Sequence, residues 1–205
     1  LNTLDAEYRI SIRQGHRYAE RLRHAKSTTT DQTSIHDECT YLITGGTGGL
    51  GLLTAAWLII QGARHITLLS RSAPSVQVLE TIDTLRTLKV DIRHMQVDIA
   101  DKTAMQKSLS VIETDMPPLK GILHCAGVLD DHLLIDQTWK NFTHVYSAKI
   151  DGSWNLHQLT DHLDLDFFVL FSSAASLLGN QGQANYAAAN MFMNSLATYR
   201  KMIGK

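Results

Sequence analysis

The sequence predicts an α/β fold in which helices cover both faces of a parallel sheet. From residue 40 onward, short apolar runs alternate with longer segments whose apolar residues recur at helical spacing. A glycine-rich stretch follows the first apolar run and opens the first helical segment. Strands that alternate with helices pair in parallel, because each helix returns the chain to the same end of the sheet. We therefore expect one α/β domain whose sheet is buried on both faces.

The predicted elements follow one another in a regular order. Strands are predicted at residues 40–44, 66–70, 92–98, 121–125 and 167–172. Helices are predicted at residues 50–61, 76–88, 102–112, 139–161 and 184–202. Gly62 is expected to cap the end of the first helix. The helix over residues 139–161 is expected to be long or broken, since Gly152 lies inside it.

The residues before this pattern have a different character. Residues 7–13 alternate polar and apolar side chains, Gln14 and Gly15 form a turn signal, and residues 16–22 return as a second strand or a short helix. Residues 25–38 are polar, and we expect them to be a linker to a main domain at residues 39–205. Folds of this class usually add another strand after the last predicted helix. We therefore expect a piece of a larger protein, truncated at both ends.

Composition and charge exclude several classes of function. The 205 residues have a formal net charge of −1 and are 44% hydrophobic, so we expect no nucleic acid or anionic membrane as a partner. No apolar run approaches the roughly 20 residues of a membrane helix, and residues 1–30 do not resemble a signal peptide. Cys39 and Cys125 are expected to be reduced thiols of a cytoplasmic protein, and the scattered histidines predict no metal site.

The glycine-rich stretch has the composition of a phosphate-binding turn. Glycines let the backbone adopt positive φ and let a phosphate approach the main chain closely. The following helix directs free N–H groups and a positive dipole end at the same point. Its place between a strand and a helix predicts a dinucleotide-binding, Rossmann-type doubly wound sheet, although a turn without a ligand is the alternative. The predicted turn comprises Thr44, Gly45, Gly46, Thr47, Gly48, Gly49, Leu50 and Gly51.

The end of the second predicted strand indicates which dinucleotide is bound. An acidic residue there would bind the ribose 2′-hydroxyl of NAD, whereas this chain has Ser70, Arg71 and Ser72. A guanidinium and two hydroxyls suit a 2′-phosphate, so NADPH is expected unless Arg71 is simply an exposed loop residue. Asp98 ends the third strand, where it either accepts a hydrogen bond from the adenine amino group or caps a helix, as Asp101 also can.

Residues later in the chain fit a hydride-transfer site. A hydride delivered to a ketone leaves an alkoxide, which a tyrosine can protonate when a lysine ammonium stabilises its phenolate. A serine hydroxyl can orient the carbonyl oxygen. Tyr186 and Ser173 lie thirteen residues apart, and the small pair Ala126 and Gly127 leaves room for a cofactor ribose. Taken one by one, each of these residues also has an ordinary structural explanation.

Five segments together resemble the short-chain dehydrogenase/reductases, and specifically the ketoreductase domain of modular polyketide synthases. They are residues 44–51, 124–131, 149–154, 171–175 and 185–190, and the resemblance runs from about residue 41 to the end. Most free-standing relatives carry a lysine four residues after the tyrosine. Here that position is Asn190, and the lysine lies upstream at Lys149. The ketoreductases of polyketide synthases and of animal-type fatty acid synthases show this exchange.

The resemblance implies a role for each site residue. Tyr186 would donate the proton and Ser173 would orient the carbonyl. Lys149 would tune Tyr186 and contact the cofactor, and Asn190 would support this network. Beside the glycine turn, the implied cofactor-binding residues are Ser70, Arg71, Ser72, Asp98, Ile99, Ala126, Gly127, Lys149 and Tyr186. Residues 1–24 would be the remnant of a structural subdomain that precedes the catalytic one.

The resemblance also implies the reaction and its setting. NADPH would reduce a β-ketoacyl thioester that is carried by the phosphopantetheine arm of an acyl carrier protein, among neighbouring synthase domains. The Leu-Asp-Asp run at residues 129–131 resembles the B-type group, which forms a D-configured β-hydroxyl. The implied substrate-orienting residues are Leu129, Asp130, Asp131, Leu178 and Gln183.

Several alternatives stay open at this point. Asp130 and Asp131 can be read as solvated loop acids. A free-standing alcohol dehydrogenase and a scaffold domain that binds cofactor weakly or not at all are alternative functions. The resemblance does not separate polyketide from fatty acid synthesis.

Overall fold

The computed structural model describes residues 10–19, 24 and 34–205, and these belong to two separate units. In the first unit, β1 (Ile10–Arg13) pairs with β2 (His16–Ala19) as an antiparallel hairpin. Gln14 and Gly15 join the strands with φ values of 50° and 77°, as in a tight two-residue turn. The second segment is therefore a strand rather than a helix. The rest of the predicted alternation, at residues 7–9 and 20–22, and residues 25–33 of the predicted linker lie outside the described residues.

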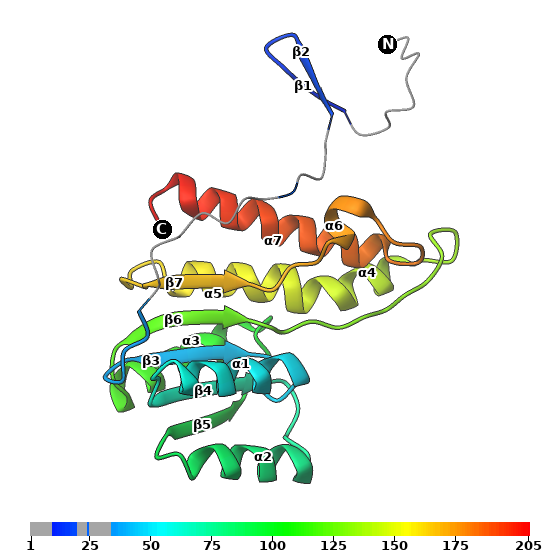
Figure 1. The fold of residues 1–205 in the computed structure, drawn as a ribbon. Coiled ribbons are helices and arrows are strands. Elements are labelled where there is room, and N and C mark those ends of the chain that lie inside the picture. Colours follow the sequence, from blue (N-terminus) through cyan, green and yellow to red (C-terminus); the bar gives the residue numbers. More distant parts are fainter. Residues whose placement is uncertain (1–9, 20–23, 25–33) are drawn as a thin grey trace. The chain divides into compact units, whose positions relative to one another are not determined.

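The second unit is built around a five-stranded parallel sheet. Its strands are β3 (Thr40–Thr44), β4 (His65–Ser70), β5 (Asp91–Gln96), β6 (Leu119–His124) and β7 (Phe167–Leu170). They lie side by side in the order β5-β4-β3-β6-β7, as Figure 1 shows. The chain builds outward from β3 in one direction and then returns to add β6 and β7 on the other side. The predicted doubly wound sheet is confirmed, and every strand boundary lies within two residues of its prediction.

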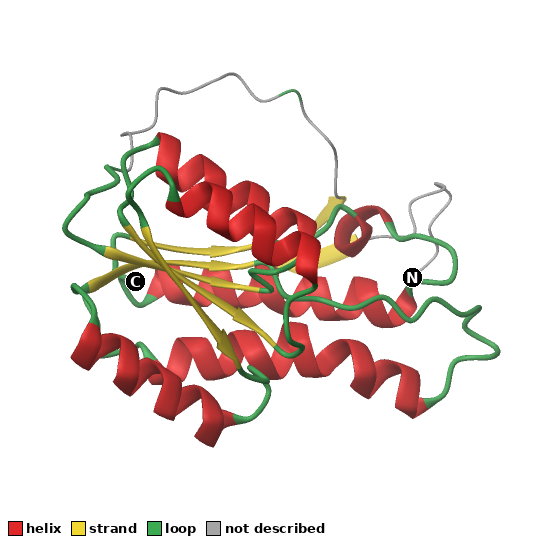
Figure 2. Ribbon diagram, turned by 90° about the horizontal axis from the view of Figure 1, so that it is seen from below, coloured by secondary structure: helices red, strands yellow, loops and turns green. Residues whose placement is uncertain are grey.

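Helices cover both faces of this sheet (Figure 2). They are α1 (Gly49–Ile60), α2 (Val76–Arg86), α3 (Lys102–Asp115), α4 (Trp139–Tyr146), α5 (Gly152–Leu159), α6 (Ala175–Leu178) and α7 (Ala184–Met202), with a π-helical turn, η1 (Ser147–Asp151), between α4 and α5. The short helix α6 was not predicted, because a single turn of four residues is too short to show helical periodicity.

The two apolar cores follow from the alternation of side chains along the strands. Tyr41 and Ile43 of β3 point to one face, where they pack with Leu58 of α1 and Ile82 of α2. Leu42 points to the other face, into a cluster with residues of α3 and α5 that comprise Met105, Leu109, Ile112 and Leu156. All of these side chains are almost completely buried. The sheet is thus apolar on both faces, as expected for parallel strands.

The first crossover helix ends as the sequence predicts. Gly62 has a φ of 115°, and its N–H donates to the Ile59 carbonyl at 3.1 Å. The Ala63 N–H donates to the Leu58 carbonyl at 2.9 Å. These two bonds form the glycine-dependent cap that satisfies the last carbonyls of a helix.

The helical region predicted at residues 139–161 runs without a gap from Trp139 to Leu159, so of the two alternatives the long helix is observed and the break at Gly152 is not. The hydrogen-bond pattern instead widens before it, where the Gly152 N–H donates to the Ser147 carbonyl five residues earlier. Gly152 is needed for packing, because a Cβ there would lie 2.5 Å from Cδ1 of Ile99. The π-turn occupies the middle of the region and includes Lys149.

The glycine turn after β3 is pressed against β4, and this generates a stability prediction. A Cβ on Gly46 would lie 2.7 Å from Cβ and 2.9 Å from Cα of Leu68. Gly46→Ala must therefore displace backbone, and we expect the free energy of unfolding to fall by about 1–3 kcal/mol in urea titrations. Gly49→Ala in the same turn is the matched control, because its Cβ would meet nothing within 4 Å. Equal losses for the two variants would contradict this account.

Candidate functional site

The glycine turn lies at the point where the strand order reverses. Gly45 has a φ of 65°, and a Cβ there would lie 2.7 Å from Cα of Ala126, in the loop that follows β6. The Gly48 N–H donates to the Gly45 carbonyl at 3.0 Å and closes the turn. No side chain caps the N-terminus of α1, whose first N–H groups are available to an anion. The turn thus has the form of a phosphate cradle.

A cavity of about 200 Å³ opens beside this turn, and we call it the turn cavity. Nine of the predicted cofactor-binding residues line it: Gly45, Thr47, Ser70, Arg71, Ser72, Asp98, Ile99, Ala126 and Gly127. Five further lining residues escaped sequence reasoning because they are apolar or small and carry no motif of their own: Leu69, Val97, Val128, Ser147 and Ala148. Six residues of the predicted turn do not line it: Thr44, Gly46, Gly48, Gly49, Leu50 and Gly51. The Thr44 hydroxyl is buried instead, 2.7 Å from Nδ1 of His124.

The loop after β4 is held by polar contacts from β5. The Ser70 hydroxyl donates to the Ser72 carbonyl at 2.7 Å and lies 2.8 Å from Nε2 of His94. The Gln96 side chain donates to the Arg71 carbonyl at 3.2 Å. The Arg71 side chain itself is exposed. The hydroxyl of Ser70 is therefore engaged in ordering the loop, and only Arg71 and Ser72 present free polar side chains from it.

The two aspartates near the end of β5 have separate roles. Asp98 is exposed at the turn cavity, and its carboxylate accepts from the Ala100 N–H at 3.0 Å. Asp101 caps α3 by accepting from the N–H groups of Thr103 and Ala104 at 2.9 and 3.0 Å. The helix-capping alternative thus holds for Asp101, while Asp98 lies where a nucleotide would contact it.

A second cavity, of about 210 Å³, contains the predicted lysine and tyrosine, and we call it the lysine cavity. Lys149 is only 4% exposed, and its ammonium donates to the Phe171 carbonyl at 3.1 Å. The same nitrogen lies 5.1 Å from the centre of the Tyr186 ring. Burial lowers the pKa of Lys149 to about 8, because a charged ammonium is poorly solvated there. The lining residues are Leu50, Cys125, Gly127, Val128, Leu129, Lys149, Phe171, Ser172 and Tyr186.

Ser173 and Asn190 lie beside this cavity rather than on its wall. The Ser173 hydroxyl accepts from the Ala175 N–H at 3.2 Å, at the start of α6. Its neighbour Ser172 does line the cavity, and the Ser172 hydroxyl donates to the Asn190 carbonyl at 3.2 Å. The Asn190 side chain is completely buried and donates to the Tyr186 carbonyl at 2.7 Å. Within the part of the chain that is described, its Oδ1 has no hydrogen-bond partner.

The predicted substrate-orienting residues differ in their relation to the lysine cavity. Leu129 lines it. The Asp130 carboxylate is 19% exposed and faces α4, where it accepts from Asn141 at 3.1 Å and lies 3.1 Å from Nδ1 of His144. The hydrogen bond with His144 is the main cause that lowers the pKa of Asp130. Asp130 is therefore not a freely solvated acid.

The other three predicted substrate-orienting residues, Asp131, Leu178 and Gln183, do not line the lysine cavity. Asp131 accepts from the Gln183 amide at 2.9 Å, which joins the loop after β6 to the start of α7. Leu178 is 59% exposed on α6. The contact between Asp131 and Gln183 links segments that are 52 residues apart in sequence, and the sequence pattern did not indicate this pairing.

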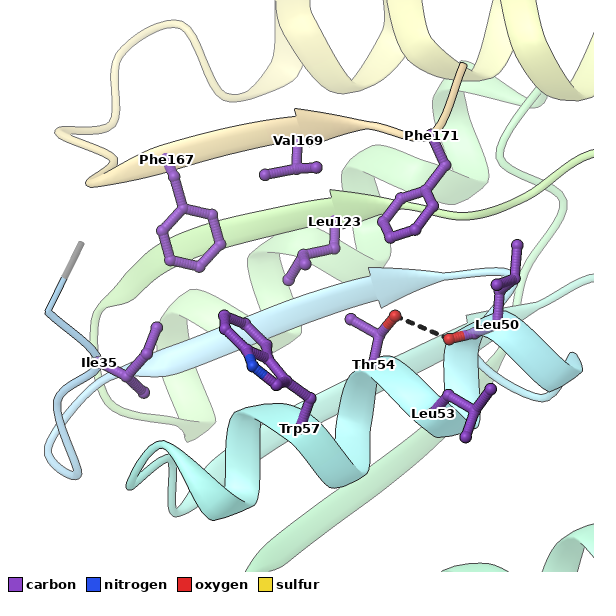
Figure 3. A pocket seen from close by; sticks show the side chains of 9 residues that line it. All are labelled: Ile35, Leu50, Leu53, Thr54, Trp57, Leu123, Phe167, Val169 and Phe171. Carbon is purple, nitrogen blue, oxygen red and sulfur yellow. Dashed lines mark hydrogen bonds between the residues drawn. The ribbon is translucent and has the colours of Figure 1, made fainter. Parts of the chain in front are cut away.

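A larger apolar groove of about 440 Å³ lies between α1 and the strands β6 and β7, as Figure 3 shows. Its walls are Ile35, Leu50, Leu53, Thr54, Trp57, Leu123, Phe167, Val169 and Phe171. The one hydroxyl among them, on Thr54, donates to the Leu50 carbonyl at 2.7 Å. With no titratable group in its walls, this groove offers no means of acid–base chemistry.

Metal-ligand clusters and membrane-spanning helices are both absent from the described residues. No group of three or more metal-ligating side chains is present among them. No helix in that part of the chain is both long and apolar enough to cross a membrane.

Comparison with known proteins gives a consistent result. Residues 39–205 match the family described as KR domain. A hybrid PKS-NRPS synthetase of Dothistroma septosporum is 40% identical over 168 residues, which are 82% of this chain and 4% of that protein. The reducing polyketide synthase PKS1 of Cochliobolus heterostrophus is 39% identical over 173 residues, which are 83% of this chain and 7% of that protein. The chain thus spans less than a tenth of the length of these curated relatives.

Solved structures agree with these relatives. A ketoreductase domain from the bacillaene assembly line superposes with a TM-score of 0.89 at 34% identity, covering 97% of this chain and 47% of that one. An A1-type ketoreductase superposes with a TM-score of 0.87 at 36% identity, covering 97% and 42%. The doubly wound sheet agrees with these similarities. The chain accordingly belongs to the KR domain family, the ketoreductase domains of polyketide synthases within the short-chain dehydrogenase/reductase superfamily.

Proposed function

We propose that this chain reduces the β-keto group of an acyl thioester, with NADPH as the hydride donor. The observation that carries the proposal is the junction of the two cavities. Gly127 and Val128 line both the turn cavity and the lysine cavity. A dinucleotide whose phosphates lie on the glycine turn can therefore extend past these two residues toward Lys149 and Tyr186. The residues present fit such a cofactor, because a side chain at Gly45 would close the cradle against Ala126.

The roles of the side chains follow from this arrangement. A nicotinamide held past Gly127 and Val128 would supply the hydride for the β-carbon. The Tyr186 hydroxyl gives its proton to the resulting alkoxide oxygen, and the Lys149 ammonium beside the ring stabilises the phenolate that remains. A serine hydroxyl orients the carbonyl, and we assign this role to Ser173, which directly follows the cavity-lining Ser172. Asn190 holds the backbone of Tyr186 from one turn further along α7.

The proposed substrate is a thioester on the phosphopantetheine arm of an acyl carrier protein. Synthases with 38–40% identity to this chain support this setting, and neighbouring synthase domains would then be its partners. In the same setting, we propose that residues 1–24 belong to a preceding structural subdomain. A scaffold without catalysis is disfavoured by the burial of a lysine charge against Tyr186, because this is costly and gives a scaffold no benefit. The exchange of Lys149 and Asn190 disfavours a free-standing dehydrogenase.

Cofactor preference is expected to depend on Arg71. Arg71→Ala removes the one guanidinium at the turn cavity, so binding of NADPH should weaken by about 1–3 kcal/mol while binding of NADH changes little. Titration of cofactor fluorescence measures both constants. Gln96→Ala, which removes only the contact to the Arg71 carbonyl, is the control for disorder of the loop. Equal losses for the two cofactors in Arg71→Ala would reject the assignment.

Turnover is expected to depend on the Tyr186 hydroxyl. Tyr186→Phe keeps the ring beside Lys149 and removes the proton donor, so kcat should fall by about a hundredfold or more. The dissociation constant of NADPH should stay within about twofold, because the ring contact is retained. The assay follows NADPH oxidation with a β-keto thioester. A variant that reduces this substrate at the wild-type rate would show that another group delivers the proton.

The buried ammonium generates a pH prediction. Lys149 has a lowered pKa of about 8, so its charged form is present below that pH and is lost as the pH rises through it. The value of kcat/KM for NADPH, which reports the cofactor-free enzyme, should therefore decline above pH 8. Lys149→Arg should keep its charge to pH 10 and shift the decline upward, even if its absolute rate is lower. A decline at the same pH in both proteins would assign it to another group.

The configuration of the product is part of the proposal. We base this part of the proposal on the Leu-Asp-Asp run at residues 129–131. The loop that carries this run directs the thioester so that the hydride reaches the carbonyl face that gives a D-β-hydroxyl. Leu129 at the lysine cavity and the fixed carboxylate of Asp130 support a positioning role for this loop. Chiral chromatography of the reduced thioester tests it. A predominantly L-configured product would overturn the configuration and leave the reductase function standing.

A further inference from the structure

Asn185 is a completely buried amide next to the catalytic tyrosine, and all of its hydrogen-bonding groups are used. Its amide nitrogen donates to the Asp130 carbonyl at 2.8 Å and to the Asn141 carbonyl at 3.2 Å. Its oxygen accepts from the Tyr186 N–H at 2.7 Å and from the Gln137 amide at 3.3 Å. A side-chain amide has two donor hydrogens and two acceptor positions, so this set is complete.

These four bonds connect three parts of the chain. One is the loop at residues 129–137, here called the mouth loop, the second is α4, and the third is the first turn of α7. Sequence reasoning gave Asn185 no role, because an asparagine beside a catalytic residue has no motif that separates it from an ordinary helix-start residue. In the structure it is the one side chain that bonds at once to the mouth loop and to the backbone of Tyr186.

The mouth loop depends on polar bonds for its position. Its apolar side chains point mostly to solvent, with Leu129, Leu134 and Ile135 exposed by 60%, 69% and 90%. Apolar burial therefore contributes little to holding it. Its described links are hydrogen bonds. Besides those to Asn185, they run from Asp130 to α4, from the Gln183 amide to the Asp131 carboxylate at 2.9 Å, and to the Gly182 carbonyl from the Gln137 amide at 3.2 Å and the His132 N–H at 2.9 Å.

The charged groups around the loop add to this attachment without replacing it. The Asp130 carboxylate lies 3.1 Å from Nδ1 of both His132 and His144, and it accepts from Asn141. All of these bonds tie the loop to itself or to α4. Other bonds of the loop reach Gly182 and Gln183, just before α7, and among the described residues the Asn185 side chain alone bonds both to the loop and to the Tyr186 backbone.

We propose that Asn185 is a positioning residue that fixes the mouth loop relative to Tyr186, and that it thereby keeps the ketone presented with one face. The inference rests on the proposed reductase function. When the link is lost, the loop and the tyrosine move independently, so the carbonyl meets the hydride from both faces while the cofactor cavity is unchanged. The Asn185 side chain acts through these two neighbours and is not itself a catalytic group.

The direct test is Asn185→Asp in the complete chain. The carboxylate keeps the acceptor for the Tyr186 N–H but loses both donors to the Asp130 and Asn141 carbonyls. Gln137→Leu breaks the link from the loop side at a half-buried position, and it also removes the bonds of this amide to the Gly182 and His132 carbonyls. Asn194→Asp is the matched control, because it removes an amide donor on the same helix that points to Ser176 of α6.

Three quantities are measured for each protein. They are the ratio of the two hydroxy enantiomers formed from the N-acetylcysteamine thioester of 3-oxohexanoic acid, hydrogen exchange of the amides at residues 129–137, and the dissociation constant of NADPH. We expect Asn185→Asp to lower the enantiomer ratio about tenfold and to speed exchange of the loop by a similar factor. Gln137→Leu should change both in the same direction by less. The NADPH constant should change by less than about twofold, and Asn194→Asp should keep the wild-type enantiomer ratio.

The outcomes separate this inference from the proposed function. Unchanged loop exchange and enantiomer ratio in both link variants would overturn the positioning role. Faster loop exchange with an unchanged enantiomer ratio would also overturn it, because the link would then be structural only. If the wild-type chain reduces no β-keto thioester, the reductase function fails, and loop exchange in Asn185→Asp still decides whether the link exists. If Asn185→Asp does not fold, the two readouts on Gln137→Leu decide in its place.

Discussion

The burial of the Lys149 ammonium is the constraint on which the rest of the site depends. Removing a charge from water is costly, and here the described partners are a carbonyl at 3.1 Å and the face of an aromatic ring, with burial lowering the lysine pKa to about 8. The surroundings also avoid a second charge, since burial and the nearby ammonium lower the pKa of His124 to about 3. Three elements thus contribute to the surroundings of the Lys149 ammonium. They supply Phe171 after β7, Tyr186 on α7 and the neutral His124 on β6.

The helical region that carries this lysine is also attached to residues that line the turn cavity. The Asn155 amide donates to the Ile99 and Ala100 carbonyls at 2.9 and 3.0 Å, which fixes α5 to the loop after β5. Ile99 in turn lines the turn cavity and packs against Gly152. The position of the ammonium and the shape of the proposed nucleotide site therefore come from the same contacts. A change in the loop after β5 is expected to be felt at both cavities.

The sequence predicted the fold well because the signals involved are local. Four of the five strands, β3, β4, β6 and β7, contain a short apolar run, and Gly62 ends α1 through a bond pattern that needs only neighbouring residues. What it missed depends on contacts across the fold: the bond from His94 to Ser70, the meeting of Asn185 with the mouth loop, and the placement of Ser172 rather than Ser173 on the cavity wall. The π-turn was also missed, because helical periodicity over residues 139–161 does not show a single turn with a wider hydrogen-bond pattern.

That π-turn has a consequence for any redesign of the helix. A π-turn contains one residue more than the α-helical turns on either side of it. Deleting one residue within Ser147–Asp151 would restore an uninterrupted α-helix from Trp139 to Leu159 and rotate one half against the other by about 100°. The aromatic side chains of α4 and the Gly152 contact with Ile99 could not both keep their places. The structure therefore constrains the number of residues in this helix as well as their types.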